Sequence, residues 1–185
     1  MVTQAPARTQ ARWAVDPVHA SIEFAVKHMV IASVKGRFAK FDANIQFDEA
    51  RPEASSVEAR IEAASVDTRE AQRDAHLRSP DFFDAEKFPY LTFRSRRIQA
   101  KGEGHYAVIG DLTIRDLTRE VALDAELVGP TKDPWGNLRA GFALQGKLNR
   151  KDFGLAWNVA LEAGGVLVGD NVKISIEGEL VKPQA

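Results

Sequence analysis

Residues 34–47 read VKGRFAKFDANIQF, and apolar and polar side chains alternate along this stretch. The apolar residues take even positions as far as Phe38 and odd positions from Phe41 onward. An alternation with a period of two is typical of a β-strand that buries one face and exposes the other. An extra residue near Ala39 and Lys40 would produce the change of parity. We therefore predict a β-bulge or sharp bend there, of the kind that lets a strand wrap around a barrel.

The same alternation recurs over most of the chain. It is clear over residues 21–27, 120–127, 138–149 and 172–177, where apolar side chains share one face and charged or amide side chains the other. Roughly eight such strands, joined mostly by short turns, predict an all-β fold, an extended eight-stranded antiparallel barrel. The interior of a barrel of this size is just wide enough to be filled by side chains or to hold one small ligand.

One segment departs from this pattern and predicts a short helix packed beside the barrel. We expect the helix to run from Thr68 to Leu77, because the hydroxyl of Thr68 can cap it and Pro80 prevents its continuation.

The composition limits the class of protein. The chain has 185 residues, a net charge of −1 and no cysteine. This length suits a single domain, which we place at residues 12–183 after a flexible N-terminal arm at residues 1–11. The small net charge gives no long-range attraction to nucleic acid, and the lack of cysteine excludes disulfides and cysteine-based metal sites. The polar first residues contain no signal-peptide core, and no later stretch approaches the roughly 20 apolar residues of a membrane helix. We therefore expect a cytoplasmic protein without an integral membrane segment.

Short motifs in a fixed order carry a resemblance to a known family. They are WAVDPVH at 13–19, FAVKHM at 24–29, GRF at 36–38, HLRSPDFF at 76–83, FP at 88–89, FRS at 93–95, LTIR at 112–115, LNRKDFG at 148–154 and VGD at 168–170. Together they resemble the YceI-like family of lipocalin-like, polyisoprenoid-binding proteins over about residues 12–181.

The resemblance implies a lipocalin-like barrel with a long apolar tunnel that holds an isoprenoid or another long-chain amphiphile. A bound polyisoprenoid or isoprenoid quinone is therefore expected, and no cofactor. The resemblance also implies a possible homodimer. Many relatives are periplasmic and carry a signal peptide, which this sequence lacks, as do the cytoplasmic relatives.

The residues expected to line the tunnel come from the inward faces of the strands and from the region between residues 153 and 168. From the alternation alone they are a packed core or a ligand tunnel, and the resemblance favours the tunnel. They are Phe24, Val26, His28, Met29, Phe38, Phe41, Phe93, Leu112, Ile114, Phe142, Leu144, Trp157, Asn158 and Leu167.

The region between Phe153 and Val168 is apolar but not periodic. It forms either a buried corner or a lip over the tunnel mouth, where Trp157 and Asn158 would meet the ligand. His19 and His28 are anchors for a polar head group or partners of nearby backbone. Arg150 either pairs with a head group or locks a turn.

No motif in the sequence indicates a catalytic site. The sequence contains no nucleophile elbow, no H-E-x-x-H, no phosphate-binding glycine loop and no metal spacing of histidines. The main hypothesis is therefore a non-enzymatic lipid binder that sequesters, stores or carries its ligand. Two alternatives stay open. One is an isomerase or hydrolase of a small apolar substrate that uses His28 and a carboxylate, and the other is a filled structural barrel.

Overall fold

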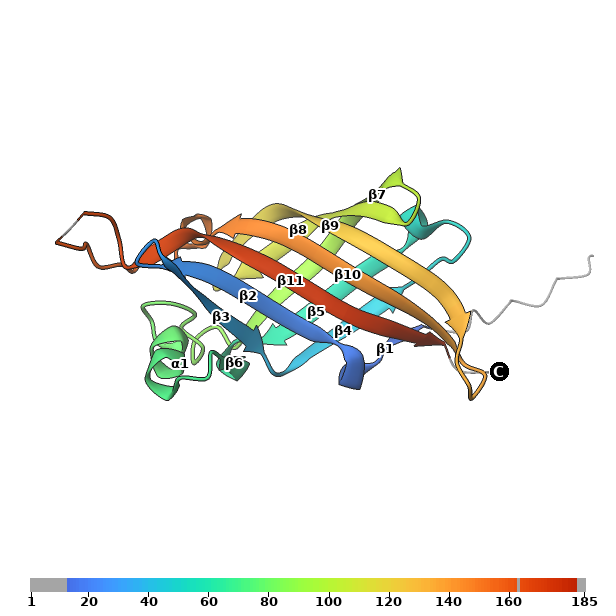
Figure 1. Cartoon of the computed structure of the whole chain (residues 1–185), viewed down its shortest axis with the longest axis horizontal. Helices are drawn as coiled ribbons and strands as arrows, with labels where there is room; N and C mark the ends of the chain where they lie inside the picture. Colours follow the sequence, from blue (N-terminus) through green and yellow to red (C-terminus); the bar gives the residue numbers. More distant parts are fainter. Residues whose placement is uncertain (1–12, 163, 183–185) are drawn as a thin grey trace, which may run out of the picture.

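A computed structural model describes residues 13–162 and 164–182, and the predicted arm at residues 1–11 lies outside them. Long antiparallel strands curl around a common axis, with one helix at one end (Figure 1). In chain order the elements are β1 (Ala14–Val15), η1 (Pro17–His19), β2 (Ser21–His28), β3 (Ala32–Phe38), β4 (Phe41–Gln46), η2 (Pro52–Ala54), β5 (Ser56–Glu62), η3 (Ala63–Ser65), β6 (Val66–Asp67), α1 (Ala71–Arg78), β7 (Tyr90–Gly102), β8 (His105–Ile114), β9 (Leu117–Lys132), β10 (Leu138–Asn149), η4 (Arg150–Phe153) and β11 (Val168–Lys182). Within the described residues, no helix is long and apolar enough to cross a bilayer.

The sheet closes on itself because two of its strands are bent. The strand order is β4-β5-β7-β8-β9-β10-β11-β2-β3-β6, and β1 pairs with β11. The two ends of this order, β4 and β6, are joined through two bent segments, because β3 continues into β4 and β5 continues through η3 into β6. The break between β3 and β4 falls at Ala39 and Lys40, which confirms the predicted bend. The Ala39 amide donates to the Ser65 carbonyl at 3.0 Å, and the Glu62 amide donates to the Lys40 carbonyl at 3.0 Å.

The strand count depends on how these bends are treated. The described residues form an 11-stranded sheet, whereas the sequence predicts about eight strands. The bend in β3–β4 and the turn η3 between β5 and β6 each divide one long strand into two. Counting each bent pair as one strand, and leaving out the two-residue β1, restores the predicted eight.

The helix begins later than predicted. α1 starts at Ala71, and its N-cap is Glu70, whose carboxylate accepts from the amides of Gln72 and Arg73. Arg69 has a φ of 61°, which a helix does not tolerate, so the chain cannot be helical from Thr68. Thr68 is instead buried, and its amide and hydroxyl both donate to the Asp74 carboxylate, at 2.8 and 2.6 Å.

The core consists of two clusters along the barrel axis. The larger cluster lies at the helix end and includes Ile61, Val66, Ile114 and Phe153. The second lies at the opposite end around Trp13, whose ring meets Phe47 edge-on at 5.4 Å between centroids. The two ends of the barrel therefore differ, and an internal cavity is found beside the larger cluster.

Candidate functional site

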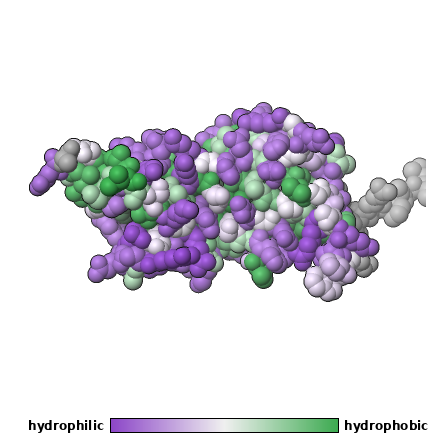
Figure 2. All heavy atoms as spheres, in the orientation of Figure 1, coloured by the Kyte–Doolittle hydropathy of each residue, from purple (hydrophilic) through white to green (hydrophobic). Residues whose placement is uncertain are grey.

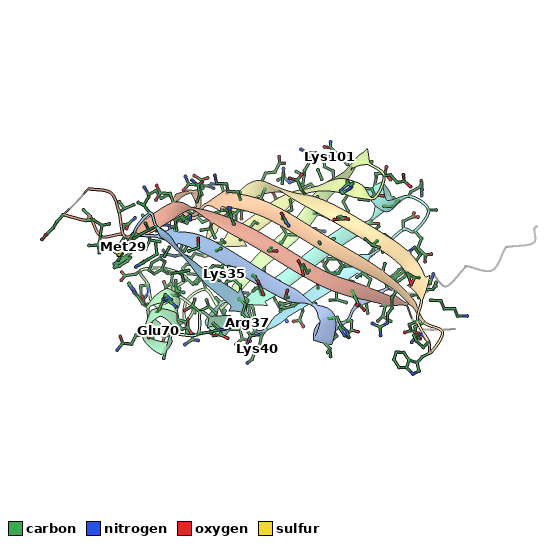
Figure 3. All side chains as sticks on the ribbon, viewed as in Figure 1. Met29, Lys35, Arg37, Lys40, Glu70 and Lys101 are labelled. Atoms are coloured by element: carbon green, nitrogen blue, oxygen red, sulfur yellow. The ribbon has the colours of Figure 1, made fainter. Side chains whose placement is uncertain are left out.

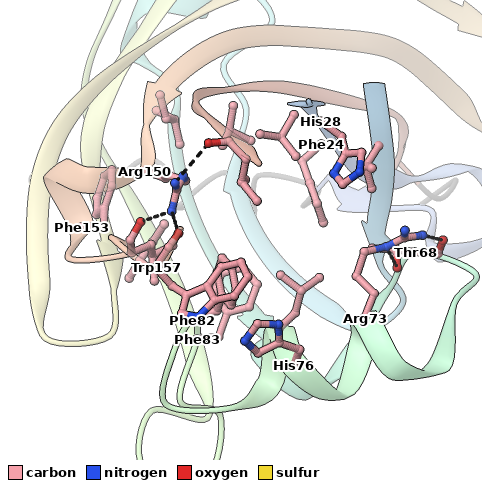
Figure 4. A pocket seen from close by; sticks show the side chains of 18 of the residues that line it. Phe24, His28, Thr68, Arg73, His76, Phe82, Phe83, Arg150, Phe153 and Trp157 are labelled. Atoms are coloured by element: carbon pink, nitrogen blue, oxygen red, sulfur yellow. Dashed lines mark hydrogen bonds between the residues drawn. The ribbon is translucent and has the colours of Figure 1, made fainter. Parts of the chain in front are cut away.

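A cavity of about 390 Å³ lies at the helix end of the barrel. Strands β2, β3 and β11 form one side and α1 the other, with the segment after β10 at the rim (Figure 4). Most of its lining side chains are apolar: Phe24, Val26, Val34, Phe38, Leu77, Phe82, Phe83, Leu91, Ile114, Leu148, Phe153, Leu155, Trp157, Leu167, Val168, Val172 and Ile174. Such a lining, with few polar groups at defined places, is typical of sites that enclose an apolar ligand.

Aromatic rings pack along the wall formed by β2 and β3. Phe24 lies directly opposite Gly36 in the β2–β3 ladder. Its ring is 5.7 Å from the ring of Phe38, which is in turn 5.6 Å from Phe83 in the segment after α1. All three rings line the cavity and form part of its wall.

Helix α1 closes the cavity and brings Arg73 to its edge. Nε of Arg73 donates to the Thr68 hydroxyl at 2.8 Å, and Nη2 donates to the Thr68 carbonyl at 3.0 Å. Arg78 anchors the end of the helix by donating to the carbonyls of Ala64 and Val66, at 2.8 and 2.9 Å. The guanidinium of Arg73 thus lies at the rim in a fixed position.

His76 connects α1 to the segment after β10. Its ring meets Trp157 edge-on at 4.5 Å and Phe82 at 5.1 Å between centroids. Nε2 lies 2.8 Å from Oδ2 of Asp81. Trp157 and His76 therefore form a contact across the rim, and the two elements must separate there for a large ligand to pass between them.

Arg150 locks the segment that carries Trp157. The side chain is 4% exposed, and it donates to the carbonyls of Leu155, Trp157 and Gly169. Burial lowers the pKa of Arg150 from its ordinary value, and the nearby Asp170 opposes this effect. Of the two interpretations of Arg150, the geometry matches a lock on a turn.

The sequence left two alternatives for the segment between Phe153 and Val168, a buried corner or a lip over the tunnel mouth, and different parts of the segment match each of them. Phe153 and Leu155 are buried as a corner that also borders the cavity, whereas Trp157 and Leu167 are only partly buried and line the cavity as well. Asn158 holds the segment together through its side chain. Nδ2 donates to the Val168 carbonyl at 2.7 Å, and Oδ1 accepts from the Val168 backbone amide at 3.0 Å.

Half of the residues predicted for the ligand site line this cavity: Phe24, Val26, His28, Phe38, Ile114, Trp157 and Leu167. The others lie elsewhere. Phe41 and Leu112 pack against the core cluster at the helix end, and Phe142 packs against the cluster around Trp13.

The remaining four predicted residues also lie outside the lining. Phe93 packs close to Gly110, and Leu144 is half-buried on β10 opposite Ile176. Met29 is 43% exposed in the β2–β3 turn, because that turn projects beyond the barrel. Asn158 makes the backbone contacts described above.

Several lining residues come from α1 and its flanks, which the sequence did not assign to the site. They are Thr68, Glu70, Gln72, Arg73, His76, Leu77, Phe82 and Phe83. The helix reads AQRDAHLR, so it lacks the apolar stripe that would predict a buried face. Only the adjacent Phe82 and Phe83, in the otherwise polar segment after the helix, indicated in the sequence that this region faces an apolar interior.

A second polar cluster lies away from the cavity. Ligand atoms of Asp16, His19 and Glu179 lie within 4.8 Å of one another. Nη1 of Arg139 donates to Asp16 at 2.9 Å and to Glu179 at 2.8 Å, so a guanidinium that stays protonated already pairs with both carboxylates. His19, one of the two predicted anchors, bonds to Asp16 at 3.0 Å in this cluster and does not line the cavity.

Comparisons with known proteins agree with this fold. A family model described as a YceI-like domain matches residues 13–180. A UPF0312 protein of Vibrio cholerae is 45% identical over 137 residues, which make up 74% of this chain and 72% of the relative. The crystal structure of a Campylobacter jejuni YCEI protein has a TM-score of 0.73 at 34% identity, over 85% of this chain and 90% of that chain.

A more distant structure shares the fold alone. It is described as a polyisoprenoid binding domain from Saccharophagus degradans implicated in plant cell wall breakdown. It has a TM-score of 0.68 at 14% identity, over 94% of this chain and all of that chain. These likenesses confirm the predicted antiparallel barrel.

Proposed function

Because the chain belongs to the YceI-like family, we propose that it binds a long-chain isoprenoid or a related amphiphilic lipid in the cavity beside α1. The observation that carries the proposal is the apolar lining of a cavity of about 390 Å³. Apolar surface removed from water contributes about 25 cal/mol per Å², so a hydrocarbon tail is the chemistry that such a lining favours. The description of the Saccharophagus degradans domain supports the same chemical class.

The polar groups at the rim suit a head group. His28, Gln72 and Arg73 line the cavity together with its apolar wall. A ligand with its tail inside and its polar end beside these groups leaves no buried charge unpaired, whereas the reverse orientation would. The volume lies near the lower end of the range for enclosed ligands, roughly 300–1,000 Å³. The cavity therefore holds one segment of a long chain.

The protein binds this ligand without converting it, and serves in sequestration, storage or transport. In the part of the chain that the structure describes, His28 has no hydrogen-bonded carboxylate that would make it a general base. Arg73 and Arg150 are engaged by hydroxyl and carbonyl oxygens of the protein itself. A cytoplasmic location and a homodimer remain predictions.

Mass spectrometry of an organic extract of gently purified protein tests this function. We expect a stoichiometric isoprenoid or other long-chain lipid. Protein that yields no lipid, and that takes up no added isoprenoid quinone, would contradict the proposal. Release of a shortened or isomerised product on incubation would favour the enzymatic alternative.

A further inference from the structure

An exposed apolar surface projects from the end of the barrel that holds the cavity. It comprises Met29, Val30 and Ile31 in the β2–β3 turn, and Val159 and Val166 in the loop before β11, and we call it the apolar tip. These residues are 43%, 71%, 82%, 46% and 40% exposed, respectively. The two loops project together at one end of the molecule (Figure 1), where hydrophobic residues gather on the surface (Figure 2).

The two loops form one surface. The amide of Met29 donates to the Leu167 carbonyl at 2.9 Å. A Cβ on Gly165 would lie 3.8 Å from Cγ2 of Val30, an ordinary contact distance. Val30 has a φ of 66°, which β-branched residues rarely adopt, so this turn holds an apolar side chain outward at a local cost. A binding partner for the exposed Val30 side chain would explain why this strained backbone conformation is kept.

The tip is continuous with the cavity. His28 precedes the β2–β3 turn, Leu167 ends the other loop, and both line the cavity. Trp157, which contacts His76 across the rim, lies close to the start of the same loop. A surface that covers the tip would therefore lie next to the place where a ligand enters.

A row of lysines lies behind the tip on the outer face of the barrel. Lys35 and Lys173 flank Ala25 in the ladders of β3, β2 and β11, and Lys147 lies opposite Lys173 on β10. Lys35 is three residues from Ala32, where β3 begins, so the row lies about 10 Å behind the strand ends. Figure 3 shows Met29 at the tip and Lys35 behind it.

These lysines carry charge that the protein itself does not neutralise. Among the described residues, Lys35, Lys147 and Lys173 have no ion pair. Most acidic groups near this end lie elsewhere: Asp170 pairs with Lys151, Glu70 and Asp81 belong to the α1 side, and Glu162 is in the loop. Glu23 lies on the same outer face as the row, two residues from Ala25 on the side away from the tip, and it forms no ion pair with these lysines. The basic row therefore distinguishes the strand side of this end from the helix side.

We propose that the apolar tip inserts into a lipid bilayer with anionic headgroups, with the lysine row against the headgroups. Apolar side chains that enter the boundary between headgroups and acyl chains, together with basic residues, give reversible binding of this kind. A second protein is a poorer partner, because stable protein interfaces take roughly 20–30 residues a side. Docking would place the cavity rim at the lipid surface, from which an isoprenoid could enter. This inference goes beyond the proposed function and can be measured without any cavity ligand.

Vesicle cosedimentation with the full chain tests the docking. We compare vesicles of phosphatidylcholine with vesicles of equal parts phosphatidylcholine and phosphatidylglycerol. Wild-type protein should bind the second kind, more weakly at high salt. Ile31→Asp should reduce binding about tenfold or more, the factor for one lost apolar side chain. Val18→Asp should leave it unchanged, because Val18 is equally exposed, at 82%, but lies in η1 away from the tip. The double variant Lys35→Glu/Lys173→Glu should lose the preference for phosphatidylglycerol.

Single cysteines give a second readout, because the natural chain has none. An environment-sensitive dye on Ile31→Cys should shift its emission to the blue with phosphatidylglycerol vesicles, whereas the same dye on Val18→Cys should not. No vesicle binding by wild-type protein, or equal losses in Ile31→Asp and Val18→Asp, would overturn the proposal. A blue shift that appears without vesicles when the protein concentration is raised would identify a contact between copies of the chain. That result would also overturn the proposal. A cavity-blocking Val26→Trp should still dock, which separates this test from the failure of lipid uptake.

Discussion

The ring of Phe24 lies over the backbone of Gly36, its direct partner on the neighbouring strand. A Cβ on residue 36 would overlap Cζ of Phe24 and would lie 2.9 Å from Cγ2 of Thr68. Because Phe24 and Thr68 both line the cavity, the missing side chain of Gly36 sets the shape of its wall.

Gly36→Ala should therefore push the Phe24 ring toward the cavity. We expect a loss of about 1–3 kcal/mol in the free energy of unfolding, as for other overpacked cores, and weaker uptake of an isoprenoid quinone. Denaturant titration and a fluorescence binding assay measure the two effects. Gly141→Ala is the control, because a Cβ there meets nothing within 4 Å. Equal behaviour of the two variants would contradict this account of the wall.

Arg150→Ala should destabilise the protein by about 3 kcal/mol or more. The substitution leaves the carbonyls of Leu155, Trp157 and Gly169 without their donor, and each unsatisfied buried acceptor costs about 1–3 kcal/mol. Lys151→Ala, next in the chain, removes only an exposed ion pair with Asp170 and should cost less than about 1 kcal/mol. Urea unfolding curves with similar midpoints for both variants would show that Arg150 is no lock.

Trp157→Ala should speed the release of a bound lipid. The change removes the edge-on contact of Trp157 with His76 and its tilted contact with Phe82 across the rim. Aromatic pairs contribute roughly 0.5–1.5 kcal/mol each, so we expect dissociation about threefold to tenfold faster. Stopped-flow transfer of a fluorescent lipid to acceptor vesicles measures the rate. Trp135→Ala, at an exposed turn away from the cavity, should change nothing, and an unchanged rate in Trp157→Ala would remove the rim from the release pathway.

Asp16→Asn should change the dependence of stability on pH. The hydrogen bond from Arg139, followed by that from His19, lowers the pKa of Asp16 far below its ordinary value of 3.8. A carboxylate whose pKa is lower in the folded state adds stability that is complete above the unfolded pKa, and it loses that stability as the pH falls below it.

Wild-type protein should therefore exceed Asp16→Asn in stability at neutral pH, and the difference should shrink between about pH 5 and pH 3. Thermal unfolding across this range provides the measurement. Asp42→Asn, whose carboxylate is 79% exposed in its pair with Arg60, serves as the control for the loss of one charge. A difference that stays constant down to about pH 3 would refute the coupling to Arg139.

The strands and the bend at Ala39 could be predicted because alternation reports directly which face of a strand is buried. The start of the helix could not. Thr68 and Glu70 are both able to cap it, and the left-handed backbone of Arg69 together with the Thr68–Asp74 bonds decides between them.

The residues that line the cavity could be predicted from the sequence only in part. Alternation identified the inward residues of β2 and β3, but it does not say where along the barrel the interior stays open. Phe142 and Phe24 have the same pattern in sequence, yet only Phe24 lies at the open end. His76 and Arg73 reach the cavity through the docking of α1, which no local pattern encodes.

The most direct test of the central claim is isothermal titration of an isoprenoid quinone into wild-type protein and two tryptophan variants. Val26→Trp places a large ring inside the cavity, whereas Ala25→Trp places the same ring on the other face of β2. We predict binding near one ligand per chain for wild-type protein and Ala25→Trp, and none for folded Val26→Trp. Unchanged binding by Val26→Trp would show that the lipid does not occupy this cavity.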